Sequence, residues 1–172
     1  MGGAGPLHAA DLATLLGMRS IVVPPQPGLA AALGLLVADV KDDFVQAFGQ
    51  NEDALDVDRA QAFFDTLEEA ALRFLDDEHV PENRRRVQRH IDMRYAGMST
   101  ETTVELAPGP VTEALLQQAI DAFHDQFHRL RGHSYAGRET VELVNLRTTA
   151  IGERAGPGVL NRLPKADRKP LP

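Results

Sequence analysis

The spacing of apolar residues changes from a helical period to a period of two near the middle of this 172-residue chain, and this change limits the folds available to it. Residues 57–77 place apolar side chains on one face and acidic side chains on the other, which predicts an amphipathic helix. From residue 87 to residue 95 the apolar positions alternate, which predicts a strand with two unlike faces. A turn at 96–99 and a second alternating segment at 102–106 complete a predicted antiparallel hairpin.

A second helix and a third strand follow the predicted hairpin. Apolar residues recur at helical spacing over 111–130, and 141–151 is rich in β-branched and apolar residues. The order of these elements predicts an α+β fold, with a small, mostly antiparallel sheet and packed helices. We assign residues 41–154 to this C-terminal domain, and interpret 41–56 as an acidic connector with a turn of helix around Phe44 to Phe48.

The first forty residues have a different organisation. A glycine-rich turn at 2–6 leads into a helical pattern at 7–16, and the β-branched segment 20–23 is interpreted as a buried strand. The next segment, 29–40, is apolar on nearly all sides and predicts a buried helix. A helix, a strand and a helix with short loops are typical of the end of an α/β domain. Residues 1–40 are therefore predicted to be the terminal piece of a separate domain.

Composition excludes several classes of function. Lys plus Arg is 18 and Asp plus Glu is 25, so the net charge of -7 argues against binding to a nucleic-acid backbone. The chain has no Cys, which excludes disulfides, thiolate nucleophiles and Cys-ligated zinc. The longest apolar segment, 29–38, is shorter than the ~20 residues that cross a bilayer. We expect a cytoplasmic protein with no membrane partner, and a flexible tail at 155–172.

Several stretches of the chain, in order along it, resemble one family. They are Gly2–Ala9, Val22–Pro24, Pro27–Gly28 followed by Ala32–Leu36 and Ala38–Asp39, then Asp92–Gly97, Phe123–His124 and Val141–Arg147. Over residues 2–152 the chain resembles the C-terminal region of the hydantoinase A and 5-oxoprolinase family. This is the hydantoin utilization protein A type, related to subunits of acetone and acetophenone carboxylases. The chain departs from the family pattern at Ala31, Met98, Phe127 and Arg131.

The resemblance implies a function for a longer protein. Residues 1–40 would end an actin-like ATPase domain, and the complete enzyme would use ATP and Mg²⁺ to open a cyclic amide such as hydantoin or 5-oxoproline. Gly2, Gly3 and Gly5 would contact the nucleotide in the complete protein, since glycine lets the backbone approach a ligand closely.

We expect the isolated chain to hold no cofactor and to be inactive. Its partner would be the rest of its own chain or a second enzyme subunit, in a homo- or hetero-oligomer without nucleic acid. The alternative is a non-catalytic subunit-interaction module of a related carboxylase-type complex. The sequence assigns no catalytic residue.

One candidate polar site lies on the predicted sheet. Asp92 and Arg94 share a strand face, where they could pair with each other, with Glu142 or with Arg147. One interpretation is a polar binding site on the open face of the sheet. The other, which we favour, is an ion-pair network that holds the strands in register.

Two further groups of side chains allow a functional interpretation. His124 and His128 are four residues apart on a predicted helix, a spacing that suits a metal site, but a solvated helix flank is favoured. Residues 84–86 together with Arg89 form a basic cluster. It could contact phosphate or an acidic partner, although a solvated strand entry beside an acidic helix is the favoured interpretation.

Overall fold

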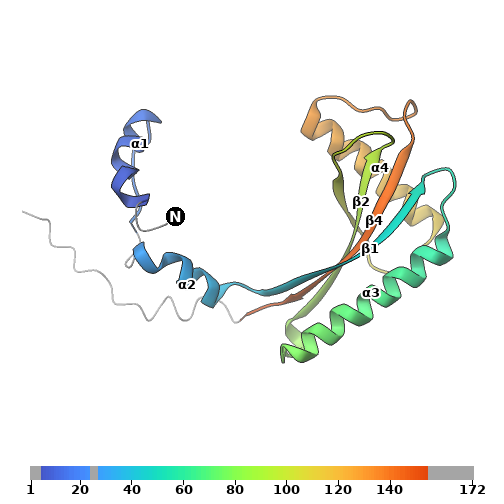
Figure 1. Ribbon diagram of the computed structural model, residues 1–172, viewed down its shortest axis with the longest axis horizontal. Helices are drawn as coiled ribbons and strands as arrows, with labels where there is room; N and C mark the ends of the chain where they lie inside the picture. The colour runs from blue at the N-terminus through green and yellow to red at the C-terminus, as the bar shows by residue number, and fades with distance from the viewer. Residues whose placement is uncertain (1–4, 24–26, 155–172) are drawn as a thin grey trace, which may run out of the picture. The chain divides into compact units, whose positions relative to one another are not determined.

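The chain divides into two units that are described separately. The computed structural model describes residues 5–23 and 27–154. One unit comprises Met1–Ala38 with Arg154–Pro172, and the other comprises Asp39–Glu153 (Figure 1). In the second unit the elements are, in order, β1 (Val40–Asn51), α3 (Val57–Asp77), η3 (Glu82–Arg84), β2 (Arg85–Tyr95), β3 (Thr102–Leu106), α4 (Glu113–Arg131) and β4 (Val141–Gly152).

The second unit is an antiparallel four-stranded sheet with two helices on one of its faces. The strand order is β1-β4-β2-β3, so β4, the last strand in the sequence, lies in the middle of the sheet. Figure 1 shows α3 and α4 on the same face of the sheet. Both helices supply side chains to the same core, which also contains residues from all four strands. Fully buried members of this core include Phe64, Tyr95, Leu116, Phe123 and Leu146. The structure confirms the predicted α+β fold.

Both long helices begin at residues with known capping chemistry, and α4 also ends at one. The Asp56 side chain accepts a hydrogen bond from the backbone N–H of Arg59 at the start of α3. Thr112 does the same for the N–H of Leu115 at the start of α4, and Gly132 ends α4 in the left-handed conformation. The predicted helices, the hairpin and the third strand are therefore confirmed to within about two residues, the usual uncertainty of element ends.

The interpretation of residues 41–56 as a connector was wrong. Residues Val40–Asn51 form the edge strand β1, which pairs antiparallel with β4 along its length except for a register shift after Ala47. Gly49 adopts a positive φ of 63° beside that shift, a conformation that glycine adopts at little cost. The strand has few buried side chains, because one of its edges and much of one face are exposed, and this hides its hydrophobic alternation.

The first unit contains the helices η1 (Gly5–His8), α1 (Ala9–Leu15), η2 (Pro27–Leu29) and α2 (Ala30–Val37). Both predicted helices are thus present, but segment 20–23 is not a strand, as the prediction had it. A strand exists only where its backbone pairs with a neighbour, and no described residue pairs with this segment. The expected burial of α2 is also absent, since Leu35 and Leu36 are exposed. The predicted tail lies outside the described residues.

Among the residues that the structure describes, no helix is both long enough and apolar enough to cross a membrane.

Gly152 tests the packing where β4 ends against the loop after α3. A Cβ at this position would lie 2.6 Å from Cγ2 of Val80, whose side chain is buried in a core beneath the sheet. We expect Gly152→Ala to lower the free energy of unfolding by about 1–3 kcal/mol through overpacking. Urea denaturation measures the change. Gly34→Ala is the matched control, because a Cβ there meets open space; equal stability of the Gly152→Ala variant and the parent would contradict the packing.

Candidate functional site

The candidate polar site is centred on the carboxylate of Asp92, on the face of the sheet opposite the helices. Only 2% of Asp92 is exposed, and its carboxylate accepts three side-chain hydrogen bonds. Nη2 of Arg147 lies 2.8 Å from Oδ2, Oγ1 of Thr103 lies 2.7 Å from Oδ1, and Nδ2 of Asn145 lies 3.4 Å from Oδ2. A buried carboxylate is stable when its oxygens are satisfied in this way.

Arg147 extends this cluster to the edge strand β1. Its Nη1 lies 3.5 Å from a carboxylate oxygen of Asp43, and the hydroxyl of Thr149 donates to the same carboxylate. The cluster therefore joins side chains from all four strands, with Arg147 between two carboxylates. We call Asp43, Asp92, Thr103, Arg147 and Thr149 the open-face network.

The other two predicted site residues form a separate pair. Nε of Arg94 donates to Oε2 of Glu142 at 2.8 Å, where β2 and β4 are in direct register. The structure thus brings the four predicted residues into two cross-strand ion pairs, Asp92 with Arg147 and Arg94 with Glu142. Every one of these charged groups has a partner, which is the arrangement expected for groups that hold strands in register.

The pKa shifts follow from these contacts. Burial alone would raise the pKa of Asp92, but the hydrogen bonds from Arg147 and Thr103 and the charge of Arg147 hold that pKa below its ordinary value. The hydrogen bond to Glu142 raises the pKa of Arg94, and that to Asp92 raises the pKa of Arg147. Asp92, Arg94 and Arg147 are therefore charged at neutral pH, and none of the three is prepared to exchange a proton there.

A shallow pocket of about 260 Å³ opens beside the network, and His90 is one of the residues that line it. Its other lining residues are Lys41, Asp43, Thr103, Arg147 and Thr149. Burial lowers the pKa of His90, although the charges of Glu105 and Asp43 oppose the change, and its Nδ1 is buried without a hydrogen-bond partner. The sequence analysis did not single out His90, Asp43 or Thr103. The signal for Asp43 was the weak alternation of β1, which had been interpreted as a connector.

The two histidines that were weak metal candidates have different environments. Nδ1 of His124 lies 2.8 Å from the hydroxyl of Tyr95, and the two rings stack. His128 is exposed on α4. No cluster of three or more His, Asp or Glu side chains suited to a metal ion occurs in the described part of the chain.

The hydroxyl of Tyr95 fixes the loop between α4 and β4. Besides His124 it contacts Oγ of Ser134 at 2.9 Å and accepts the backbone N–H of Tyr135 at 3.0 Å. Tyr95 is fully buried and its ring also packs on Phe127, one of the four residues that depart from the family pattern. His124 is therefore part of a structural contact between β2, α4 and this loop.

The predicted nucleotide-contacting glycines lie in the first unit. Gly5 begins η1, whereas Gly2 and Gly3 lie outside the described residues. Their contact with a nucleotide stays a prediction.

Comparison with known proteins gives a match at the start of the chain. The family model described as hydantoinase/oxoprolinase matches residues 1–44. This match supports the resemblance to the hydantoinase/oxoprolinase family. An uncharacterized protein of Methanocaldococcus jannaschii is 36% identical over 152 residues, which cover 88% of this chain and 21% of that protein. Caprolactamase subunit alpha of Pseudomonas jessenii is 26% identical over 159 residues, which cover 91% of this chain and 23% of the subunit.

Solved structures extend the likeness to the fold. The crystal structure of ATP-dependent caprolactamase from Pseudomonas jessenii aligns with a TM-score of 0.71 and 25% identity, over 90% of this chain and 22% of that one. The nucleotide-free structure of acetone carboxylase has a TM-score of 0.73 at 20% identity, over 89% of this chain and 23% of that one, and shows a shared fold. The chain thus spans about a fifth of the length of the relatives just described.

The depressed pKa of Asp92 predicts a pH dependence of stability. Its charged form stabilises the folded chain above the unfolded pKa, near the ordinary value of 3.8, and this contribution is lost as the pH falls through the lower folded pKa. Asp92→Asn should cost about 1–3 kcal/mol at neutral pH, because a partly buried Arg147 loses its charged partner. The cost should shrink in acid, which urea denaturation between neutral pH and about pH 3 would measure.

The matched control for Asp92→Asn is Asp125→Asn on α4, since Asp125 is exposed. A cost of Asp92→Asn that stays constant with pH would contradict the assigned pKa direction.

The contact at Tyr95 predicts a local effect. Tyr95→Phe removes a buried hydroxyl with three partners, so we expect a loss of about 1–3 kcal/mol in unfolding free energy and faster amide hydrogen exchange over residues 133–140. Hydrogen exchange followed by mass spectrometry measures both the unfolding free energy and the exchange rate of residues 133–140. Tyr135→Phe is the control, because no hydrogen bond of the Tyr135 hydroxyl occurs among the described residues. Unchanged amide exchange over residues 133–140 would show that the Tyr95 hydroxyl does not fix this loop.

Proposed function

We propose that this chain is the C-terminal part of an ATP-dependent enzyme that opens a cyclic amide, such as hydantoin or 5-oxoproline. The observation that carries the proposal is the likeness to caprolactamase subunit alpha over 91% of the chain, since caprolactam is itself a cyclic amide. The family match at residues 1–44 supports the same class of chemistry. Transfer of the γ-phosphoryl group of ATP to the ring-amide oxygen would release ADP and make the amide carbon more electrophilic. Water would then attack that carbon, the ring C–N bond would break with the nitrogen leaving as an amine, and hydrolysis of the acyl phosphate would release phosphate and leave a carboxylate.

The proposed contribution of this chain is to complete the enzyme and not to catalyse by itself. Gly2, Gly3 and Gly5 would let the backbone approach the nucleotide, with ATP and Mg²⁺ held chiefly by the remainder of the protein. In the second unit the charged residues of the open-face network are already paired with each other. Such groups stabilise a scaffold, whereas acid–base catalysis at neutral pH needs groups whose pKa lies near 7.

A second candidate function is a non-catalytic module that joins subunits of a carboxylase-type complex. The first unit favours it, because large apolar side chains there are exposed in this chain, with Leu15 at 81%, Val22 at 89% and Leu35 at 76%. Exposed apolar surface of this extent marks an interface. A partner would be the rest of the same polypeptide or another subunit, in a homo- or hetero-oligomer. Analytical ultracentrifugation that finds a clean monomer at high concentration would count against self-association through this surface.

An ATPase assay on two preparations tests the main proposal. The isolated chain should not hydrolyse ATP with hydantoin, 5-oxoproline or caprolactam, because it spans about a fifth of its relatives. The second preparation is the polypeptide obtained by extending the reading frame upstream of Met1, or co-expression with the adjacent gene products. There we expect ATP hydrolysis that depends on one of these cyclic amides.

Turnover by the isolated chain would contradict the proposal that this chain completes the enzyme and does not catalyse by itself. Turnover that requires acetone and bicarbonate, and ignores the cyclic amides, would replace the main proposal with the carboxylase-type alternative.

A further inference from the structure

His90 lies on the open face of β2 and has an enclosed ring nitrogen. In the register of the sheet it is directly opposite Arg147 on β4 and Glu105 on β3. Its Nδ1 is buried and has no hydrogen-bond partner among the described residues. A neutral imidazole can carry its one proton on Nε2 and leave Nδ1 as an acceptor. An imidazolium would place an N–H at Nδ1 with nothing to accept it, which is costly in a buried position.

The charged groups that face His90 are balanced in sign. Two carboxylates and two cations face it from the neighbouring strands, namely Glu105 of β3, Asp43 and Lys41 of β1, and Arg147 of β4. On the strand of His90 itself, Asp92 is engaged by Arg147. Because the opposite charges offset one another, burial of the ring decides, and it lowers the pKa of His90 below the ordinary value of 6.5.

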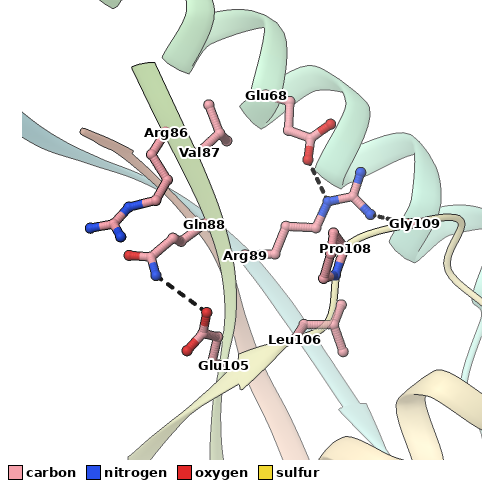
Figure 2. A pocket seen from close by; sticks show the side chains of 9 residues that line it. All are labelled: Glu68, Arg86, Val87, Gln88, Arg89, Glu105, Leu106, Pro108 and Gly109. Carbon is pink, nitrogen blue, oxygen red and sulfur yellow. Dashed lines mark hydrogen bonds and ion pairs between the residues drawn. The ribbon is translucent and has the colours of Figure 1, made fainter. Parts of the chain in front are cut away.

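Of the two carboxylates, Asp43 is the one placed to respond to a proton on His90. Both side chains line the same pocket. The contact between Asp43 and Arg147 is 3.5 Å long, and 43% of the Asp43 side chain is exposed. Glu105 instead points toward Gln88, whose amide donates to it at 3.2 Å (Figure 2). The link between Asp43 and Arg147 is therefore the contact that a new charge on His90 would disturb first.

Asp43 is also the residue that ties β1 to the open-face network. Through its carboxylate, β1 contacts Arg147 and Thr149 of β4. Of the twelve residues of β1 only Phe48 is buried, so few apolar contacts hold this strand. Segments with few buried contacts are the first to open when local stability falls. β1 is therefore the element that a change at His90 would release.

We propose that His90 makes the open-face network sensitive to protons, so that uptake of one proton by its imidazole releases the first half of β1 from β4. The ring is neutral when the network is arranged as in this structure. Protonation places a positive charge beside Arg147 and draws Asp43 away from Arg147 and Thr149. The proposal rests on the second unit alone and does not depend on the proposed enzyme function.

The direction of the pH dependence follows from the lowered pKa of His90. As the pH falls, the unfolded chain binds this proton before the folded chain does. The stability that the neutral ring contributes is therefore complete above the unfolded value of 6.5 and declines as the pH falls below it. This range is separate from the loss caused by Asp92, which begins near 3.8.

An NMR titration of the purified chain tests the proposal. The imidazole signals of His90 should give a pKa below 6.5. Amide exchange is compared at about pH 7.5 and about pH 5.5, as protection factors that remove the intrinsic effect of pH. We expect the protection of residues 41–45 to fall about threefold or more in acid, while the protection of α4 changes little, because the release is local.

Three variants identify the groups responsible. His90→Gln keeps a polar side chain without a titrating ring, and it should remove the difference between the two pH values. His128→Gln is the matched control, since His128 is exposed on α4, and it should keep the difference. Asp43→Asn should give, at neutral pH, the low protection of β1 that acid gives in the parent chain.

The proposal is overturned if the pKa of His90 is above 6.5, or if the protection of residues 41–45 does not change with pH. It is also overturned if the His90→Gln chain keeps the pH difference of the His128→Gln chain. If His90→Gln does not fold, the titration of the parent chain and the Asp43→Asn variant decide.

Discussion

The second unit depends on the pairing of β4 between β1 and β2. A hairpin such as β2 and β3 is marginal alone, and it becomes stable when a further strand and a packed helix cover its apolar face. β4 supplies that cover, and Val141, Leu143, Leu146 and Ala150 are all fully buried in the cores between the sheet and the helices. The pairing with β1 joins residues that are about a hundred positions apart, so the sheet closes only when both ends of this unit meet.

The same central strand determines the open-face network. Arg147 lies on β4, so its guanidinium reaches Asp43 on one neighbouring side and Asp92 on the other. Asp92 can remain charged at 2% exposure only because Arg147 and Thr103 satisfy its oxygens. A one-residue slip of β4 would turn Arg147 to the apolar face and leave Asp92 without its cation. The network thus opposes such slips and holds the four strands in register.

The local spacing of apolar residues was sufficient to predict the elements that pack against the core. Residues 57–77 show a complete amphipathic period and a capping Asp56, and α3 has those bounds. β2 and β3 alternate clearly because one face of each is buried. β1 was missed because an exposed edge strand needs few apolar residues, and its charged start and Gly49 are typical of a loop. The opposite error occurred at 20–23, where β-branched residues predict a strand but no described segment pairs with it.

The candidate site was likewise predictable from sequence only in part. The alternation at 87–95 placed Asp92 and Arg94 on one face from sequence alone, and the family resemblance came from stretches spread along the chain. Only the tertiary structure decided that Asp92 pairs with Arg147 while Arg94 pairs with Glu142, and that Asp43 and His90 lie beside them. It also decided that β3 pairs with residues 89–93 of β2 and not with the start of that strand. Sequence determines which side chains share a face, because that depends on local backbone period. Partner choice depends on strand order and register, which are set when distant segments pack together.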